Sequence, residues 1–437
     1  MTRLLSLTVV LVILTHTVLI AQPMVFTETY TYQASEIDSK VSSRIIALQE
    51  VKRILLEKIG VYIESQTEVE NFVITRDQIT AFTAGIVQCE IIDEEWTGKT
   101  YTLTAKLTAD PKEVAENVSK LQKDRQKTAE LLVIREELEK SRQEIASLRE
   151  QLSGTSEDQK QRYNEAVKVM NVTQLLQEGN MHVFNNRFDA AIEAFERCLV
   201  LDPNNHRAYY GLGYVYTELS QSRIDDMIEA LEYFRRALEI EPVYLAARNS
   251  LVGGLLNVGT MYANSGNYAQ AVNLFSEALA EGDGASDRVL SITYANRATA
   301  LTRLNKLTEA LEDCNKAIEL TPEYAKGYMQ KVRVISELDT NWNKRADVLR
   351  YLNIAAVLGD PEAQKFLDLN NINWRDMQNL ILAALTGNQE AHIFLTQQQI
   401  PVTRIADLVR LAVMNNDDYA QNFLEGIEIP WEKFSID

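Results

Sequence analysis

Apolar and polar positions over residues 163–361 follow one pattern with a period of about 40 residues. Four copies of it carry related fragments, which read AIEAFERCLVLDP, ALEYFRRALEIEP, AVNLFSEALAEGD and ALEDCNKAIELTP. Most copies, including a weaker fifth, end at a proline; these are Pro203, Pro242, Pro322 and Pro361. Apolar residues recur within each copy at the three-and-four spacing of a helix, and proline cannot continue a helix. We therefore expect helix pairs that each leave an apolar face uncovered and stack into an array.

Small residues stand where the two helices of a copy must cross. In the second copy, we expect Gly213 of the first helix to touch Ala230 of the second, with Phe234 filling the space beside them. These copies resemble tetratricopeptide repeats, which are helix pairs of about 34 residues. Their longer period reflects extra residues, for example at 220–225.

The resemblance implies that the first helix of each pair lines a concave face that binds protein partners. The candidate partner-binding residues at these positions are Asn180, Arg207, Tyr210, Tyr214, Thr260, Asn296, Lys326 and Arg333. One copy also resembles repeats that clamp the C-terminal carboxylate of chaperones, and Asn296 and Lys326 match two clamp positions. Leu256, Thr260 and Gln330 do not match the other three. Because a carboxylate needs charge-assisted recognition, we do not expect this ligand.

A second, shorter repeat follows within residues 352–437. Its three units, LNIAAVLGDPEAQKFLDLNNI, LILAALTGNQEAHIFLTQQQI and LVRLAVMNNDDYAQNFLEGIEI, begin at the evenly spaced Leu352, Leu380 and Leu408. Each unit predicts two short helices about a Gly, Asn or Asp turn, and the first resembles the end of a Sel-one-like repeat. We expect the stack to continue to the C-terminus, where Trp431 and Phe434 cover the last open face.

Residues 22–110 predict a small α+β domain. A strand candidate begins at Val25, and an apolar helix face runs from Ile37 to Ile59, where Gly60 is expected to end the helix. Two alternating runs joined by a polar link with Gly98 then predict a hairpin. The pattern resembles the N-terminal domain of the flagellar assembly protein T family. That resemblance implies a bacterial envelope location and a role in assembly, without implying flagella.

Residues 111–160 are charged and predict a short coiled coil followed by a polar linker. A three-and-four spacing connects mostly apolar residues from Leu131 to Leu152, including Leu138 and Ile145. This seam either pairs with its copy in a homodimer through residues 131–152 or folds back on the repeats.

Residues 1–21 predict a targeting segment. Arg3 is the only charge, and Leu4 to Ala21 are uncharged. This uncharged stretch is short for a membrane-spanning helix, so we expect a cleaved signal peptide and a periplasmic or envelope location; a retained membrane anchor is the alternative.

Composition and motifs give no support for chemistry. The net charge is −18, and no zone has the basic excess that nucleic acid favours. Histidines and cysteines lack metal-ligand spacing, and no phosphate loop or serine elbow is present. Cys198 and Cys314 fall at core positions of the repeats, and an acidic cluster at 93–95 is expected in a solvated turn. We expect no enzymatic activity, no cofactor or metal, and no nucleic-acid or small-molecule ligand.

The predicted fold class is mainly α: a tetratricopeptide-like solenoid preceded by a small α+β domain and a short coiled coil. The predicted parts are 1–21 (signal), 22–110 (α+β), 111–160 (coiled coil and linker), 161–361 (repeats) and 352–437 (shorter repeats and cap). Three functions are open: a scaffold that binds unidentified proteins through its concave face, an assembly factor that works through its N-terminal domain with the repeats as a spacer, or a regulatory subunit of an envelope enzyme.

Overall fold

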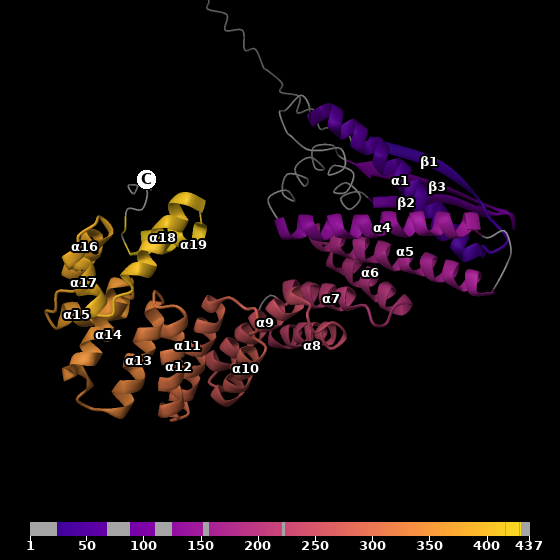
Figure 1. Ribbon diagram of the computed structural model, residues 1–437. Coiled ribbons are helices and arrows are strands. Elements are labelled where there is room, and N and C mark those ends of the chain that lie inside the picture. The colour runs from indigo at the N-terminus through magenta and orange to yellow at the C-terminus, as the bar shows by residue number, and fades with distance from the viewer. Residues whose placement is uncertain are drawn as a thin grey trace, which may run out of the picture. The chain divides into compact units, whose positions relative to one another are not determined.

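The computed structural model divides the chain into two compact units, Met1–Pro203 and Asn204–Asp437 (Figure 1). The described residues are 24–67, 88–109, 125–151, 157–220, 223–415, 417–427 and 429. Within them, no helix is both long and apolar enough to span a bilayer. The predicted signal peptide, residues 1–21, lies outside the described residues.

Unit 1 begins with a three-stranded antiparallel sheet of order β1-β3-β2. Its strands are β1 (Met24–Gln33), β2 (Gln88–Trp96) and β3 (Thr100–Ala109). The predicted hairpin is confirmed: β2 pairs with β3, and the turn holds Gly98 at φ +88°, which favours glycine. The acidic residues 93–95 were expected in a turn, but they lie within β2, where Arg44 bonds Glu94 at 2.7 Å.

Helix α1 (Lys40–Thr67) covers one face of this sheet. Val51, Leu55 and Ile59 are buried against the sheet side chains, as the predicted apolar face requires. The predicted end of the helix at Gly60 is wrong, because α1 continues through it to Thr67. Glycine inside a helix costs only about 1 kcal/mol relative to alanine, so it does not stop a helix whose other residues support it.

The charged helix α4 (Arg125–Gln151) packs on α5 (Glu157–Phe184) of the same chain. Leu138 and Ile145, each 6% exposed, form one apolar cluster with Tyr163 and Met170 of α5. This corrects the expectation of a homodimer through 131–152: the seam is covered within one chain. The fold-back alternative is the one that the structure shows, and the polar linker is short because α5 already begins at Glu157.

Buried polar contacts also join α1 to α5. Gln49 Nε2 donates to Gln174 Oε1, and both side chains are buried. Lys52 forms an ion pair with Glu178 at 2.5 Å. Burial disfavours the Glu178 carboxylate, but Lys52 and the Gln174 amide outweigh it and lower the pKa of Glu178. Since α5 pairs with α6 (Phe188–Leu201) as the first repeat, that repeat and the α+β domain form one unit.

Unit 2 begins with four helix pairs. They are α7 (His206–Leu219) and α8 (Ile224–Ile240), α9 (Leu245–Asn264) and α10 (Tyr268–Ala280), α11 (Asp287–Arg303) and α12 (Leu307–Leu320), and α13 (Ala325–Leu338) and α14 (Ala346–Val357). The predicted crossing point is confirmed. A Cβ added to Gly213 would lie 2.6 Å from the ring of Phe234 and 3.1 Å from the carbonyl oxygen of Ala230. The aromatic ring therefore packs directly on the glycine.

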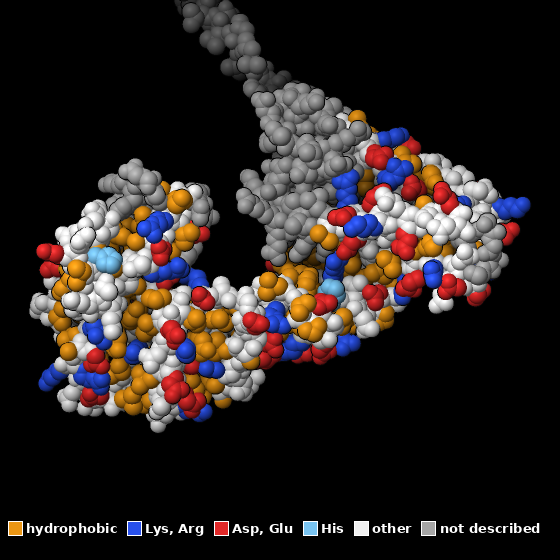
Figure 2. Space-filling view, viewed as in Figure 1, with side chains coloured by type: hydrophobic (Ala, Val, Ile, Leu, Met, Phe, Trp, Pro, Cys, Tyr) orange, Lys and Arg blue, Asp and Glu red, His pale blue; other side chains and the backbone are white. Residues whose placement is uncertain are grey.

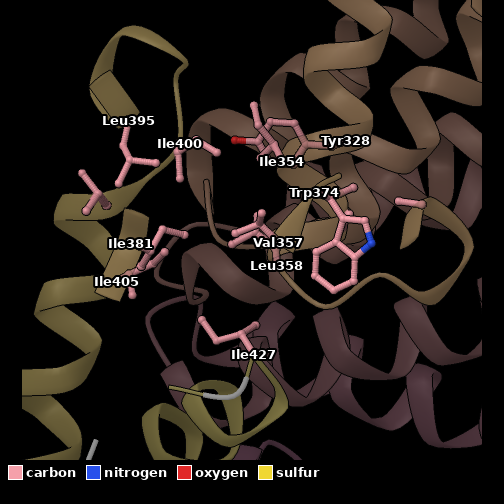
Figure 3. Packing of buried hydrophobic residues seen from close by; sticks show 14 of the residues in the cluster. Tyr328, Ile354, Val357, Leu358, Trp374, Ile381, Leu395, Ile400, Ile405 and Ile427 are labelled. Atoms are coloured by element: carbon pink, nitrogen blue, oxygen red, sulfur yellow. The ribbon is translucent and has the colours of Figure 1, made fainter. Parts of the chain in front are cut away.

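The shorter repeats form α15 (Pro361–Leu369), α16 (Arg375–Leu385), α17 (Gln389–Gln397), α18 (Val402–Asn415) and α19 (Asp418–Gly426). The same cap starts each second helix: the side chains of Asp360, Asn388 and Asp417 each accept a hydrogen bond from the main-chain N–H of an alanine three residues on, at 2.8–3.0 Å. One apolar cluster joins these helices to α13 and α14 (Figure 3). Trp431 and Phe434, the predicted cap, lie outside the described residues.

Candidate functional site: the inner face of unit 2

The first helices of consecutive repeats line one face of unit 2. Helix α7 contacts α9, α9 contacts α11, and α11 contacts α13 (Figure 1). The second helices α8, α10 and α12 each pack against first helices on both sides. Because a stack curves toward the side on which its helices approach one another directly, the first helices lie on the inner face.

A hydrogen bond between neighbouring repeats joins two of the candidate residues on this face. Asn296 Nδ2 of α11 donates to Thr260 Oγ1 of α9 at 3.2 Å. The same Thr260 hydroxyl donates to the carbonyl of Leu256 at 2.7 Å, which fixes its orientation. The structure thus brings Thr260 and Asn296 together, as the shared inner-face position predicts.

A second bond of this kind was not predicted. Gln330 Nε2 of α13 donates to Thr302 Oγ1 of α11 at 3.4 Å, and Gln330 is 5% exposed. Gln330 occupies, in the next copy of the repeat, the position that Asn296 holds in its own. That equivalence in repeat position could have identified Gln330 from the sequence. The two bonds therefore involve uncharged amide and hydroxyl groups on the first helices of three consecutive repeats.

The three candidates on α7 lie differently. The ring of Tyr210 meets the ring of Tyr244 edge-on at 5.3 Å and that of Phe234 at 5.9 Å. The Tyr210 ring therefore packs against α8 of its own repeat and the residue that precedes α9 of the next. Arg207 and Tyr214 are half-buried on the same helix.

The remaining candidates do not join the Thr260–Asn296 pair. Lys326 is exposed near the start of α13, and Arg333 forms an ion pair with Glu362 of α15. Asn180 is half-buried on α5, which belongs to unit 1. The Thr260–Asn296 bond between α9 and α11 is therefore the one contact between candidate residues that the described part of the structure shows.

A half-buried ion pair holds α11 between its neighbours. Arg297 of α11 donates two hydrogen bonds to the Asp313 carboxylate of α12, both 2.8 Å, and a third to Ser276 Oγ of α10 at 3.0 Å. The hydrogen bonds to Asp313 raise the pKa of Arg297 above its usual value despite burial. Such two-point, charge-assisted bonds fix geometry, so the helix that carries Asn296 is held at both sides.

The cysteine side chains, which could in principle react, are part of the core. Cys198 and Cys314 are fully buried, and burial raises the pKa of both thiols to about 12, which disfavours the reactive thiolate. Both therefore lie in the core, as predicted. Within the described part of the chain, no three His, Cys, Asp or Glu side chains group as metal ligands would. On the face shown in Figure 2, Lys and Arg side chains are mixed with Asp and Glu.

Family comparisons identify the repeats. The family described as "TPR repeat" matches residues 179–220, and those described as "Tetratricopeptide repeat" match residues 206–244 and 256–325. The match to residues 256–325 includes both Thr260 and Asn296.

Curated relatives match over short stretches. The DnaJ homolog subfamily C member 7 homolog of Dictyostelium discoideum is 34% identical over 109 residues, which is 24% of this chain and 20% of that protein. The mitochondrial import receptor subunit TOM70 of Rattus norvegicus is 35% identical over 92 residues, or 21% of this chain and 15% of that protein. The chain thus spans a fifth or less of the length of these relatives.

Solved structures are similar at lower identity. A MamA fragment from Desulfovibrio magneticus RS-1 is 16% identical, covers 45% of this chain and 97% of its own, and has a TM-score of 0.31.

Proposed function

We propose that this tetratricopeptide-repeat chain is a non-enzymatic scaffold that binds protein partners along the inner face of unit 2. The observation that carries the proposal is the continuous row of first helices, joined by the Thr260–Asn296 and Thr302–Gln330 hydrogen bonds. Tetratricopeptide repeats are protein-binding modules, and this row places polar groups from three repeats on one face.

The chemistry of the face favours the main chain of an extended peptide as the ligand. The half-buried Asn296 amide already donates one hydrogen to the Thr260 hydroxyl, which leaves its carbonyl oxygen as an acceptor for a peptide N–H group. Gln330 is buried and uncharged at a position where a carboxylate clamp needs a cation. A partner therefore does not need a free C-terminal carboxylate.

The test is capture of partners by the full-length chain carrying one of two equivalent substitutions. Asn296→Arg places a long cation on the inner face, whereas Asn315→Arg places the same residue at an exposed position of the second helix α12. We expect Asn296→Arg to lose partners and Asn315→Arg to retain them. Equal retention by both variants would show that the inner face does not bind.

We further propose export to the bacterial envelope. The uncharged segment Leu4–Ala21 and the resemblance of the N-terminal domain to that of the flagellar assembly protein T family support it. The mature protein should begin near Gln22 and be found outside the cytoplasm. An N-terminal sequence starting at Met1 in the cytosolic fraction would contradict this.

A role for unit 1 as the working part is the second candidate function. The Gln49–Gln174 and Lys52–Glu178 contacts favour it, because they join the α+β domain firmly to the first repeat. Residues 204–437 expressed alone should retain partners if the inner face of unit 2 binds them, and should lose them if unit 1 is the working part.

A further inference from the structure

The two edges of the β1-β3-β2 sheet are built differently. On β2, the pairing with β3 is interrupted between Ile91 and Asp93, and four carboxylates, at Glu90 and residues 93–95, line the strand. Bulges and charges are the features that protect a natural edge strand from pairing with another chain. The β2 edge is therefore protected.

The β1 edge carries none of these features. Strand β1 pairs with β3 in unbroken register from Met24 to Gln33, without glycine, proline or a bulge. Its one charged side chain, Glu28, is paired with Lys58 of α1. Among the described residues, no strand pairs with the outer edge of β1, which is the outermost strand of the sheet in Figure 1.

The outward face of β1 is uniformly neutral. Its exposed side chains are Val25, Thr27, Thr29, Thr31 and Gln33. Thr29 and Thr31 already form hydroxyl pairs with Thr104 and Thr102 of β3, at 2.8 and 3.1 Å. Cross-strand threonine pairs stabilise sheets, so a neutral, β-branched strand is a suitable neighbour on the other side.

We infer that β1 pairs with β1 of a second copy of this chain, antiparallel and centred on Thr29, to form a six-stranded sheet. A two-fold axis perpendicular to the sheet keeps both copies of α1 on one face, and each outward residue then opposes an outward residue. Centres at Glu28 and Thr29 pair the longest stretches of β1. A centre at Glu28 sets two carboxylates opposite each other, which is destabilising. A centre at Thr29 sets Thr29 against Thr29 and Thr27 against Thr31.

One contact limits the length of the pairing. Arg149 of α4 donates to the main-chain carbonyl of Gln33, so the last residue of β1 is already engaged. The shared ladder then runs from about Phe26 to Tyr32, which is still longer than the usual strand of about five to six residues.

Disulfide trapping in the full-length chain tests the centre of symmetry. Thr29→Cys places a thiol against its own copy, within the Cα separation of less than about 7 Å that a disulfide requires. Val25→Cys places a thiol on the same face, but its copy lies eight residues away along the strand, about 27 Å at 3.4 Å per residue. We expect a covalent dimer from Thr29→Cys only. No dimer from Thr29→Cys, or equal dimer from both variants, would overturn the inference.

Mass measurements provide a second, independent test. Thr29→Lys opposes two ammonium groups at the axis, whereas Thr104→Lys removes the same hydroxyl pair from the central strand. The unmodified chain and Thr104→Lys should have twice the monomer mass in solution, and Thr29→Lys should have the monomer mass, with equal helix content by circular dichroism. A monomeric unmodified chain at high concentration would refute the pairing.

Discussion

Adding one methyl group to a glycine should have opposite effects at two places in unit 2. Gly213 of α7 lies under the ring of Phe234, and an added Cβ would approach Cε1 and Cδ1 to 2.6 and 2.7 Å. Gly253 of α9 has no atom within 4 Å of the same added carbon. Both glycines are inside helices, so alanine improves the helix propensity of each by about 1 kcal/mol.

The difference between the two variants isolates the strain. Because the propensity gain is common to both, Gly213→Ala should be less stable than Gly253→Ala by the cost of overpacking alone, about 1–3 kcal/mol. Phe234 is 2% exposed, so its ring has little space into which to move. Gly253→Ala should itself be more stable than the unmodified chain.

Thermal unfolding followed by helix circular dichroism measures this difference. For a unit of about 150–250 residues, 1 kcal/mol shifts Tm by about 2–4 °C, so the two variants should differ by about 2–12 °C. Equal Tm values would refute the assigned crossing point, and with it the alignment of the repeats that places Thr260 and Asn296 on the inner face.

Three further outcomes follow from the contacts. Ala230→Trp should lower Tm far more than Glu229→Trp, since Ala230 is 2% exposed at the crossing point and Glu229 lies outside it on the same helix; equal losses would contradict the register. Ile145→Lys should make unit 1 more sensitive to proteolysis, because Ile145 is covered by α5 of the same chain; a lower mass in solution with unit 1 still resistant to proteolysis would instead favour the coiled-coil dimer. Burial disfavours the Glu94 carboxylate, but Arg44 and Tyr101 outweigh it and lower its pKa, so the contribution of Glu94 to stability should be present above the ordinary carboxyl pKa and be lost as pH falls through the lower folded pKa. Glu94→Gln should remove that pH dependence from acid unfolding curves, and an unchanged curve would contradict the assignment.

The repeats could be predicted because their signal is local and recurs. The spacing of Gly213, Ala230 and Phe234 identifies a crossing of two helices. Both helices belong to one copy of the repeat, so no contact with a distant part of the chain has to be known. The shorter C-terminal repeat was detectable for the same reason, and its turns share one cap at Asp360 and Asn388.

The packing of α4 could not be predicted in the same way. An apolar seam such as that of Leu138 and Ile145 indicates that the helix packs against another helix. From the sequence alone, α5 and the same helix of a second copy are equally suitable partners. Tyr210 shows the corresponding limit for a site residue. Its position in the repeat places Tyr210 on the first helix, which lines the inner face. The sequence does not say whether the ring projects from that face or packs inward, and the structure shows it packed on Phe234 and Tyr244.

The most direct test of the scaffold proposal is site-specific photo-crosslinking in intact cells. A photoreactive residue would replace Asn296 on the inner face or Asn315 on α12 in the full-length chain. We expect position 296 to yield defined protein adducts that position 315 does not. Adducts at position 315 alone, or the same adducts at both positions, would contradict binding along the inner face of unit 2.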